Sequence, residues 1–148
     1  MSVRIEWHGD KLADRLEKKL GNAVKQAAVL LQNRARILAN TPARRIRAKR
    51  TRDTSGGKRG SQYTLFIPSA PGRPPALRTG FGRRNITMEF HPKQLIARVG
   101  VRTNAAYMAY LELGTRKIKA RPWLRPAMEQ TREAIDLLIQ GAIGDAAR

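Results

Sequence analysis

The chain of 148 residues contains no cysteine, so it forms no disulfide and no thiolate metal site. This absence allows a reducing compartment without requiring one. Long apolar runs are also missing: the longest, such as Ala27 to Leu31, have about five residues, against roughly 20 needed to cross a bilayer. The start, Met1 to Trp7, lacks the apolar stretch of a signal peptide. We therefore expect a soluble protein, made in a cytoplasm, with no membrane partner.

Acidic residues are scarce. The 11 Asp and Glu residues stand against 30 Lys and Arg residues, which gives a formal net charge of +19. Such an excess predicts affinity for polyanions or acidic protein surfaces, and repulsion between free copies. Nucleic acid is the obvious partner class. The alternative is a basic loop that docks on a protein, and the charge alone leaves both open.

Aromatic residues make up only 5% of the chain, too few and too scattered for a platform on which bases stack. The sequence also lacks the spacing of a zinc finger, the pattern of a basic zipper and a short helix-turn-helix. Any contact with DNA would therefore be with phosphates, which makes it nonspecific and sensitive to salt.

Candidates for nucleophilic or general acid–base catalysis are equally few. The two histidines, His8 and His91, each lie beside a predicted turn with no carboxylate at ligand spacing. No serine occupies a nucleophile elbow. Residues 56–60 are rich in glycine but lack the spacing and the Lys-Ser/Thr ending of a phosphate-binding loop. We expect no enzymatic activity and no cofactor.

A metal-dependent nuclease would need clustered carboxylates. Glu129, Glu133 and Asp136 lie on one predicted helix. However, Arg125 and Arg132 stand four residues before Glu129 and Asp136, so solvated pairs of opposite charge explain these acids. We therefore predict no metal site.

Glu112 differs from the other acids because it lies between two leucines at the end of a mostly apolar helix. A carboxylate that is partly buried needs a partner of opposite charge. We expect Glu112 to pair with Arg121 or Arg125 and to have a structural rather than a catalytic role.

The apolar pattern predicts a strand over residues 2–8 and then a long helix over residues 11–39, with Asp10 as its N-cap. The helix ends at Asn40-Thr41-Pro42, because the residue before proline avoids helical geometry. One apolar stripe recurs every three or four residues along it. Its members are Leu12, Leu16, Leu20, Val24, Ala27, Leu31, Ala35 and Leu38.

Residues 43–62 are the most basic part of the chain, and only Asp53 opposes their positive charge. Apolar residues are nearly absent, so this segment cannot bury enough surface to fold alone. We interpret residues 43–62 as a flexible basic arm or loop. Its candidate contacts with nucleic acid or a partner protein are Arg44, Arg45, Arg47, Lys49, Arg50, Arg52, Lys58 and Arg59.

The second half predicts a brief strand over residues 63–67, followed by prolines between 68 and 75 that hold the chain extended. Alternating apolar residues predict strands over 84–90 and 95–102 that pair as an antiparallel hairpin. A short helix over 105–113 follows, in which Tyr107, Tyr110 and Leu111 share one side.

The last helix is expected to open at Pro126, since proline is favoured in a first turn, and to run to about residue 143. Its inner face would consist of Met128, Ile135, Leu138 and Ala142. The order of elements predicts an α+β fold in a single domain, residues 1–148. A long N-terminal helix and C-terminal helices would pack on a small antiparallel sheet, with a long basic loop.

Three segments of the C-terminal half carry distinctive patterns. Residues 71–80 are rich in proline and end in Arg-Thr-Gly, residues 106–115 contain Tyr-x-x-Tyr-Leu-Glu-Leu-Gly-Thr, and residues 120–128 begin Ala-Arg-Pro-Trp-Leu-Arg-Pro. In this order, and with the long helix, they resemble the neck and minor tail-component family of tailed bacteriophages over most of the chain. The motif residues are Arg78, Thr79, Gly80, Tyr107, Tyr110, Glu112, Gly114, Thr115, Arg121, Pro122, Trp123, Leu124, Arg125 and Pro126.

The resemblance implies a structural virion protein at the head–tail junction of the tail, either a neck or a tail-completion subunit. Such a subunit would form a homo-oligomeric ring around the DNA channel and would assemble in the host cytoplasm. Its partners would be neighbouring head-completion or connector proteins and tail proteins, with possible nonspecific contact with genomic DNA. The run from Arg44 to Arg59 is more basic than the family pattern requires. The alternative is a nonspecific basic nucleic-acid-binding protein, and a nuclease is a remote third.

Some motif residues also have a physical interpretation of their own. Gly80, Gly82 and Gly114 allow tight turns or a positive φ. Trp123 and Leu124 are candidates for a buried anchor, either in the core or against a neighbouring subunit, and the core is favoured.

Overall fold

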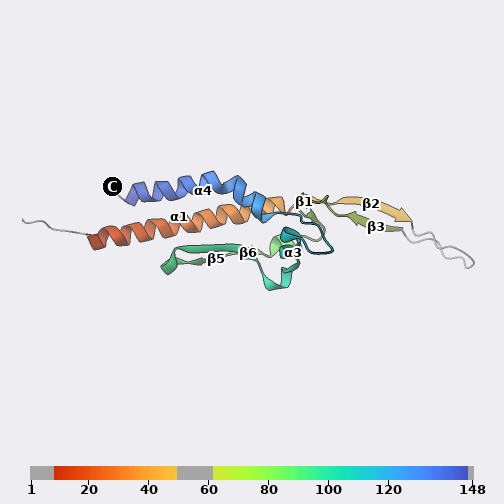
Figure 1. Ribbon diagram of the computed structural model, residues 1–148, viewed down its shortest axis with the longest axis horizontal. Helices are drawn as coiled ribbons and strands as arrows, with labels where there is room; N and C mark the ends of the chain where they lie inside the picture. The colour runs from red at the N-terminus through yellow and green to blue at the C-terminus, as the bar shows by residue number, and fades with distance from the viewer. Residues whose placement is uncertain (1–8, 50–61, 147–148) are drawn as a thin grey trace, which may run out of the picture.

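The computed structural model describes residues 9–49 and 62–146, and its fold is α+β (Figure 1). The predicted strand over residues 2–8 and the cations Arg50, Arg52, Lys58 and Arg59 lie outside the described residues. The helices and strands are α1 (Gly9–Leu38), β1 (Thr41–Pro42), β2 (Arg44–Lys49), β3 (Gln62–Ile67), β4 (Ala76–Leu77), α2 (Phe81–Arg84), β5 (Ile86–His91), β6 (Ile96–Val101), α3 (Tyr107–Leu113) and α4 (Leu124–Ala146).

Helix α1 is packed on two sides. In Figure 1 it lies between α4, which runs back antiparallel to it, and the β5–β6 hairpin. Its buried residues are all small: Ala23, Ala27, Ala28 and Ala35. The predicted long helix is confirmed, although Asp10 lies within its first turn instead of capping it. Because two faces of α1 are covered, its buried positions extend beyond the single predicted stripe, and Leu12 at the free end is exposed.

Helix α4 begins at Leu124, two residues before the predicted start. Pro126 therefore lies within the first turn, where a missing N–H costs nothing. Of the predicted inner face, Ile135, Leu138 and Ala142 are partly buried, but Met128 is wrong: it is 48% exposed, and Ala127 and Thr131 are buried at this end of the helix instead. The Thr131 hydroxyl donates a hydrogen bond to the Ala127 carbonyl at 2.9 Å, which satisfies this polar group inside the helix pair.

The predicted β5–β6 hairpin is confirmed. Its strands pair antiparallel from Ile86 opposite Val101 to His91 opposite Ile96. One face of the hairpin carries Ile86, Met88 and Phe90, and it faces the long helix, since the ring of Phe90 lies near Gly21 of α1. The side chains of Gln32 and Arg36 on α1 donate hydrogen bonds to the Ile86 carbonyl at 3.1 and 2.7 Å. These contacts fix the hairpin against the helix.

The basic segment is more ordered at its ends than its composition indicated. Residues 44–49 form β2, which pairs antiparallel with β3 from Arg44 opposite Ile67 to Lys49 opposite Gln62. The expectation of a loop without regular structure was therefore wrong for residues 44–49, whereas the brief strand before the prolines is confirmed. Figure 1 shows strands β2 and β3 extending away from the helices beyond the end of α1. From here on, the arm means these two strands, residues 44–49 and 62–67.

The core lies where the end of α1, the start of the β5–β6 hairpin, α3 and the start of α4 meet. Its central residues are Ala35, Ala39, Ile86, Met108, Trp123 and Ala127. The short parallel pair of β1 with β4 brings the end of the proline-rich segment back to the base of the arm. No helix within residues 9–49 and 62–146 combines the length and apolarity needed to cross a membrane.

Candidate functional site

The three motif segments, although distant in sequence, meet in one place. The Gly72 N–H donates to the Ala120 carbonyl at 2.9 Å, and the Arg121 Nε donates to the Ser69 carbonyl at 2.9 Å. The Arg121 main-chain N–H donates to the Leu111 carbonyl on α3. The proline-rich segment, α3 and the start of α4 therefore form one continuous structure. We call it the motif junction (residues 69–82, 106–115 and 120–128).

Trp123 is the apolar centre of the motif junction. Its side chain is 2% exposed, and it packs in the same cluster as Ile86, Met108 and Ala127. The indole Nε1–H donates to the Met108 carbonyl at 3.0 Å, so the one polar atom of the ring is satisfied. The core position favoured for Trp123 is confirmed, and Leu124 packs partly buried against the same cluster.

Glu112 joins the end of α3 to the start of α4. Its Oε2 accepts hydrogen bonds from the main-chain N–H groups of Trp123 at 2.6 Å and Leu124 at 2.8 Å, and its Oε1 accepts from that of Arg125 at 2.8 Å. The first N–H groups of a helix have no partner within the helix, and its N-terminus favours negative charge. Glu112 therefore caps α4 from another helix.

The expected pairing of Glu112 with an arginine side chain is corrected by these contacts. The Arg121 side chain bonds to Ser69 instead, and Arg125 contributes its main chain. The structural role predicted for Glu112 holds, but its partner is the N-terminus of a helix. Local sequence does not show this partner, because the helix end reaches the carboxylate only through the fold.

The motif glycines serve two different purposes. Gly80 and Gly114 have φ of 73° and 77°, and a Cβ on Gly114 would lie 3.0 Å from the main-chain nitrogen of Ala120. Both positions therefore need glycine for backbone geometry. Gly82 has no positive φ, but its Cβ would lie 2.6 Å from the Tyr107 hydroxyl and 2.5 Å from the Met108 sulfur. Gly82 thus permits the close approach of α2 to α3.

The two motif threonines support turns. The Thr115 hydroxyl accepts from the N–H of Lys117 at 3.3 Å and of Ile118 at 3.1 Å, which closes the loop after α3. The Thr79 hydroxyl accepts from the Phe81 N–H at 3.3 Å at the start of α2. Pro122 lies half-buried between Arg121 and Trp123, where it stiffens the connection.

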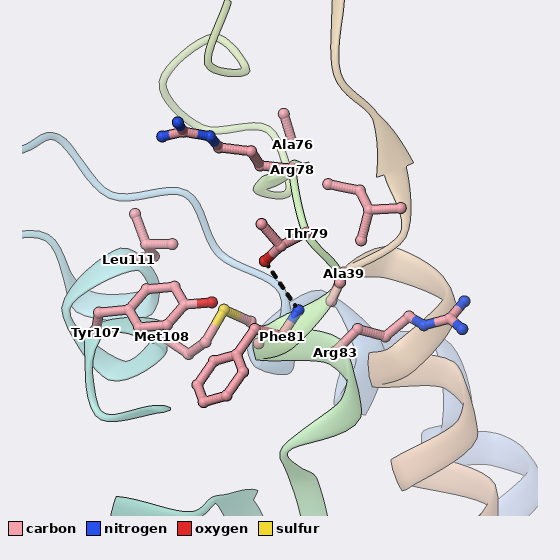
Figure 2. Close-up of a pocket in the computed structure, with 12 residues that line it drawn as sticks. Ala39, Ala76, Arg78, Thr79, Phe81, Arg83, Tyr107, Met108 and Leu111 are labelled. Carbon is pink, nitrogen blue, oxygen red and sulfur yellow. Dashed lines mark hydrogen bonds between the residues drawn. The ribbon is translucent and has the colours of Figure 1, made fainter. Parts of the chain in front are cut away.

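A cavity of about 450 Å³ opens at the motif junction between the proline-rich segment and α3. Figure 2 shows Tyr107 and Met108 across from Thr79, while Arg78 and Arg83 extend away on opposite sides. Its lining residues are Ala39, Ala76, Leu77, Arg78, Thr79, Gly80, Phe81, Gly82, Arg83, Tyr107, Met108 and Leu111. This lining contains no carboxylate, histidine or serine; it combines the polar Arg78, Thr79, Arg83 and Tyr107 with an apolar part that includes Leu77, Met108 and Leu111.

Helix α3 carries an exposed apolar stripe on its outer side. Tyr107, Tyr110 and Leu113 are 44%, 59% and 76% exposed, and their spacing of three residues places them next to one another. We call these three residues the α3 stripe. Leu111, expected to share a side with the two tyrosines, packs partly buried against the core and lines the cavity together with Tyr107, whereas Tyr110 does not. The motif helix thus has an inner side that holds the core and an outer side that is exposed at Tyr110 and Leu113, with Tyr107 at its edge, where the hydroxyl lies beside Gly82.

The candidate contact residues of the arm divide between its two faces. Arg45 and Arg47 share one face with Phe66 and Thr64, because directly opposed residues of paired strands point the same way. Arg44 lies on the other face, and all three arginines are exposed. Lys49 ends β2, while the remaining four candidates lie outside the described residues.

Arg78 links the first motif to the arm. Its guanidinium carbon lies 5.3 Å from the ring centroid of Phe66, and that of Arg45 lies 5.5 Å from the same centroid. Both distances fall within the range of a cation–π contact. The sequence placed Arg78 in a motif but did not predict its contact with the arm. That contact depends on the parallel pairing of β1 with β4.

The three acidic residues of α4 that could suggest a metal site, Glu129, Glu133 and Asp136, are exposed, as is His91 at the end of β5. In the part of the chain that the structure describes, no group of three or more His, Asp or Glu residues could hold a metal ion.

Comparisons with known proteins found no matching family model, no similar curated protein and no similar solved structure.

Proposed function

We propose that this protein is a structural subunit of the head–tail junction of a tailed bacteriophage, a neck or tail-completion protein that assembles as a ring around the DNA channel. The α3 stripe is the observation that carries the proposal. Tyr107, Tyr110 and Leu113 lie on the helix that bears the second motif, and large apolar side chains grouped on a surface mark an interaction site. The proposed occupant is a second copy of the chain.

The composition of the core supports assembly. Most of the buried residues are alanines, and Trp123 and Ile86 are the largest fully buried side chains. By contrast, Ile37 on α1 and Leu137 on α4 are 60% and 63% exposed. A chain that hides small side chains and exposes large ones gains apolar burial when copies associate, at about 25 cal/mol per Å² of apolar surface covered.

The motif junction would hold the α3 stripe in a fixed position. Three main-chain bonds to Glu112, the buried Trp123 and the close approach at Gly82 fix α3 relative to α4 and the proline-rich segment. Surfaces that are fixed in the free subunit lose less conformational freedom when they associate. The proposal assigns no chemistry to the cavity, whose apolar part beside Tyr107 would receive a side chain of the neighbouring subunit.

The test is the oligomeric state of the full chain, measured by native mass spectrometry and by light scattering over a range of concentrations. The expected result is a ring-sized oligomer, which Tyr110→Ser with Leu113→Ser converts to a monomer with an unchanged circular dichroism spectrum. Ile96→Ser is the matched control, since Ile96 is 41% exposed at the far end of the hairpin. A wild-type chain that is monomeric at every concentration, and absent from the neck in reconstructions of particles, would exclude the proposal.

Nonspecific nucleic-acid binding is the second candidate function, favoured by the exposed Arg45 and Arg47 on the arm. It requires tight, salt-dependent binding of DNA and does not require a ring. A monomer that binds DNA would support this candidate over the first.

A further inference from the structure

The two faces of the arm differ in chemistry. On one face, Arg45 stands opposite Phe66 and Arg47 opposite Thr64; on the other, Ile46 stands opposite Leu65. Side chains alternate between the faces of a strand, so the arginines of the first face project together. Ile46 and Leu65 are 43% and 44% exposed, so the second face presents apolar groups.

Arg78 adds a third guanidinium to the first face. Phe66 is partly buried and has two guanidinium carbons, those of Arg45 and Arg78, within 5.5 Å of its ring centroid. A guanidinium held over an aromatic ring keeps its N–H edge available for an acceptor. We call Arg45, Arg47 and Arg78 around Phe66 the cationic face.

Acidic residues are scarce in the sequence around this face. Asp53 is the only acidic residue between Glu17 and Glu89, and strands β2 and β3 contain none. Like charges placed close together repel one another, so an anion is the partner that stabilises the cationic face.

We propose that the cationic face binds the phosphodiester backbone of nucleic acid. Arg45 and Arg47 are two residues apart on β2, which separates their positions by about 6.8 Å, so their long side chains can reach separate phosphates. Guanidinium groups bind phosphate oxygens in a bidentate manner. The contact is with the backbone and carries no sequence preference.

A phosphodiester backbone fits this face better than an acidic protein patch. The excess of positive charge is continuous through the sequence from Lys18 to Met88, with Asp53 as its one interruption. Duplex DNA presents one negative charge for about every 1.7 Å of its axis, a uniform partner for such a surface. A two-stranded ribbon is also narrow enough to follow a groove of the duplex.

This inference stands independently of the proposed ring. Oligomeric state tests the ring, whereas binding of DNA by the full chain tests the cationic face. A protein that forms rings and does not bind DNA would overturn the inference alone, and a monomer that binds DNA through this face would overturn the ring alone.

The experiment measures the affinity of the full chain for a random-sequence DNA duplex by fluorescence anisotropy, between 50 and 200 mM NaCl. The test variant is R45Q with R47Q. The matched control is R44Q with R73Q, which removes the same number of positive charges from the opposite side of the arm. There Arg44, Ile67 and Arg73 line a separate groove. The test variant should reduce the slope of log affinity against log salt by about 1.8. The control should leave the slope nearly unchanged.

Two further variants examine the other members of the cationic face. R78Q should reduce the slope by about 0.9, because it removes one phosphate contact. F66L keeps every charge, so it should leave the slope unchanged and weaken binding by about two- to fivefold through loss of the ring that positions two guanidinium groups. Circular dichroism and thermal unfolding establish that each variant is folded.

Three outcomes would overturn the inference. The first is no binding of DNA at 50 mM NaCl. The second is an equal change of slope in the R45Q/R47Q and R44Q/R73Q variants, which would mean that net charge alone decides. The third is binding of poly-glutamate as tightly as DNA with the same dependence on Arg45 and Arg47, which would identify an acidic protein as the partner.

Discussion

The motif junction and the arm are two basic regions of one chain that are stabilised in opposite ways. In the motif junction Trp123 is buried, Glu112 accepts three hydrogen bonds, and the glycines allow close packing. The arm is one pair of strands that extends away from the helices (Figure 1). An isolated two-stranded hairpin is only marginally stable in water. The comparison teaches that the junction is held by contacts within the subunit, whereas the arm has few such contacts and would gain stability from the nucleic acid proposed to bind it.

Loss of the buried indole should have the largest effect. We expect Trp123→Ala to lower the free energy of unfolding by about 3–5 kcal/mol, because it leaves a cavity at the centre of the motif junction and removes the hydrogen bond from the indole to the Met108 carbonyl. Chemical denaturation measures the change. Tyr110→Ala, at a side chain that is 59% exposed, serves as the control in conditions that keep the chain dissociated. Equal losses in the two variants would contradict the distinction between inner and outer residues of the junction.

Removal of the interhelical cap should have the next largest effect. Glu112→Ala leaves three N–H groups of α4 without their acceptor, and we expect a loss of about 2 kcal/mol. Glu112→Gln keeps one acceptor oxygen and should lose less. Glu129→Ala, at an exposed position on α4, is the control and should change stability by less than about 0.5 kcal/mol. If Glu112→Ala were as stable as its control, the capping role would be wrong.

Replacing Gly21 and Gly82 by alanine should change the stability in opposite directions. A Cβ at Gly21 would meet Leu95 and Phe90 at 3.6 and 3.7 Å, ordinary contact distances, so Gly21→Ala should stabilise α1 by about 0.5–1 kcal/mol. Gly82→Ala should instead destabilise, because its Cβ would meet the Met108 sulfur at 2.5 Å. Thermal unfolding of the two variants measures the signs. A shift of both melting temperatures in the same direction would contradict the different packing at the two sites.

Truncation on the arm should have the smallest effect on global stability. Ile46→Ala should change the free energy of unfolding by less than about 0.5 kcal/mol, since Ile46 is 43% exposed. The matched variant Ile86→Ala removes the same side chain from a fully buried position and should cost about 2–5 kcal/mol. A large loss of stability from Ile46→Ala would show that the arm packs as tightly as the motif junction. The contrast between the two regions would then be wrong.

Periodicity was sufficient to predict the elements whose patterns are local. The β5–β6 hairpin, the long α1 and the short α3 followed from alternating or helical spacing of apolar residues. Strand β2 was missed because its composition is dominated by Arg44, Arg45 and Arg47, although Ile46 and Ala48 alternate with them. The main-chain hydrogen bonds to β3 stabilise this strand, and they do not depend on the apolar content of the segment.

The errors within correctly predicted elements have a different origin. On α4, Met128 is the larger apolar residue, yet the neighbouring Ala127 is buried in the cluster that contains Ala35 of α1, and Met128 is 48% exposed. The Glu112 partner and the approach of Arg78 to Phe66 depend on segments that meet only in the fold. Residue type predicted that these side chains matter, and three-dimensional contact was needed to identify their partners.

Glu112 holds the first turn of α4, while packing against α1 holds the rest of that helix. Helix α4 has 23 residues and is therefore about 34 Å long, so each degree of tilt at its start displaces its far end by about 0.6 Å. In the ring proposed above, every copy would repeat the same tilt, and the angular errors would add around the circumference. By holding the first turn of α4 at one angle, the carboxylate of Glu112 would keep these errors small enough for the last copy to meet the first.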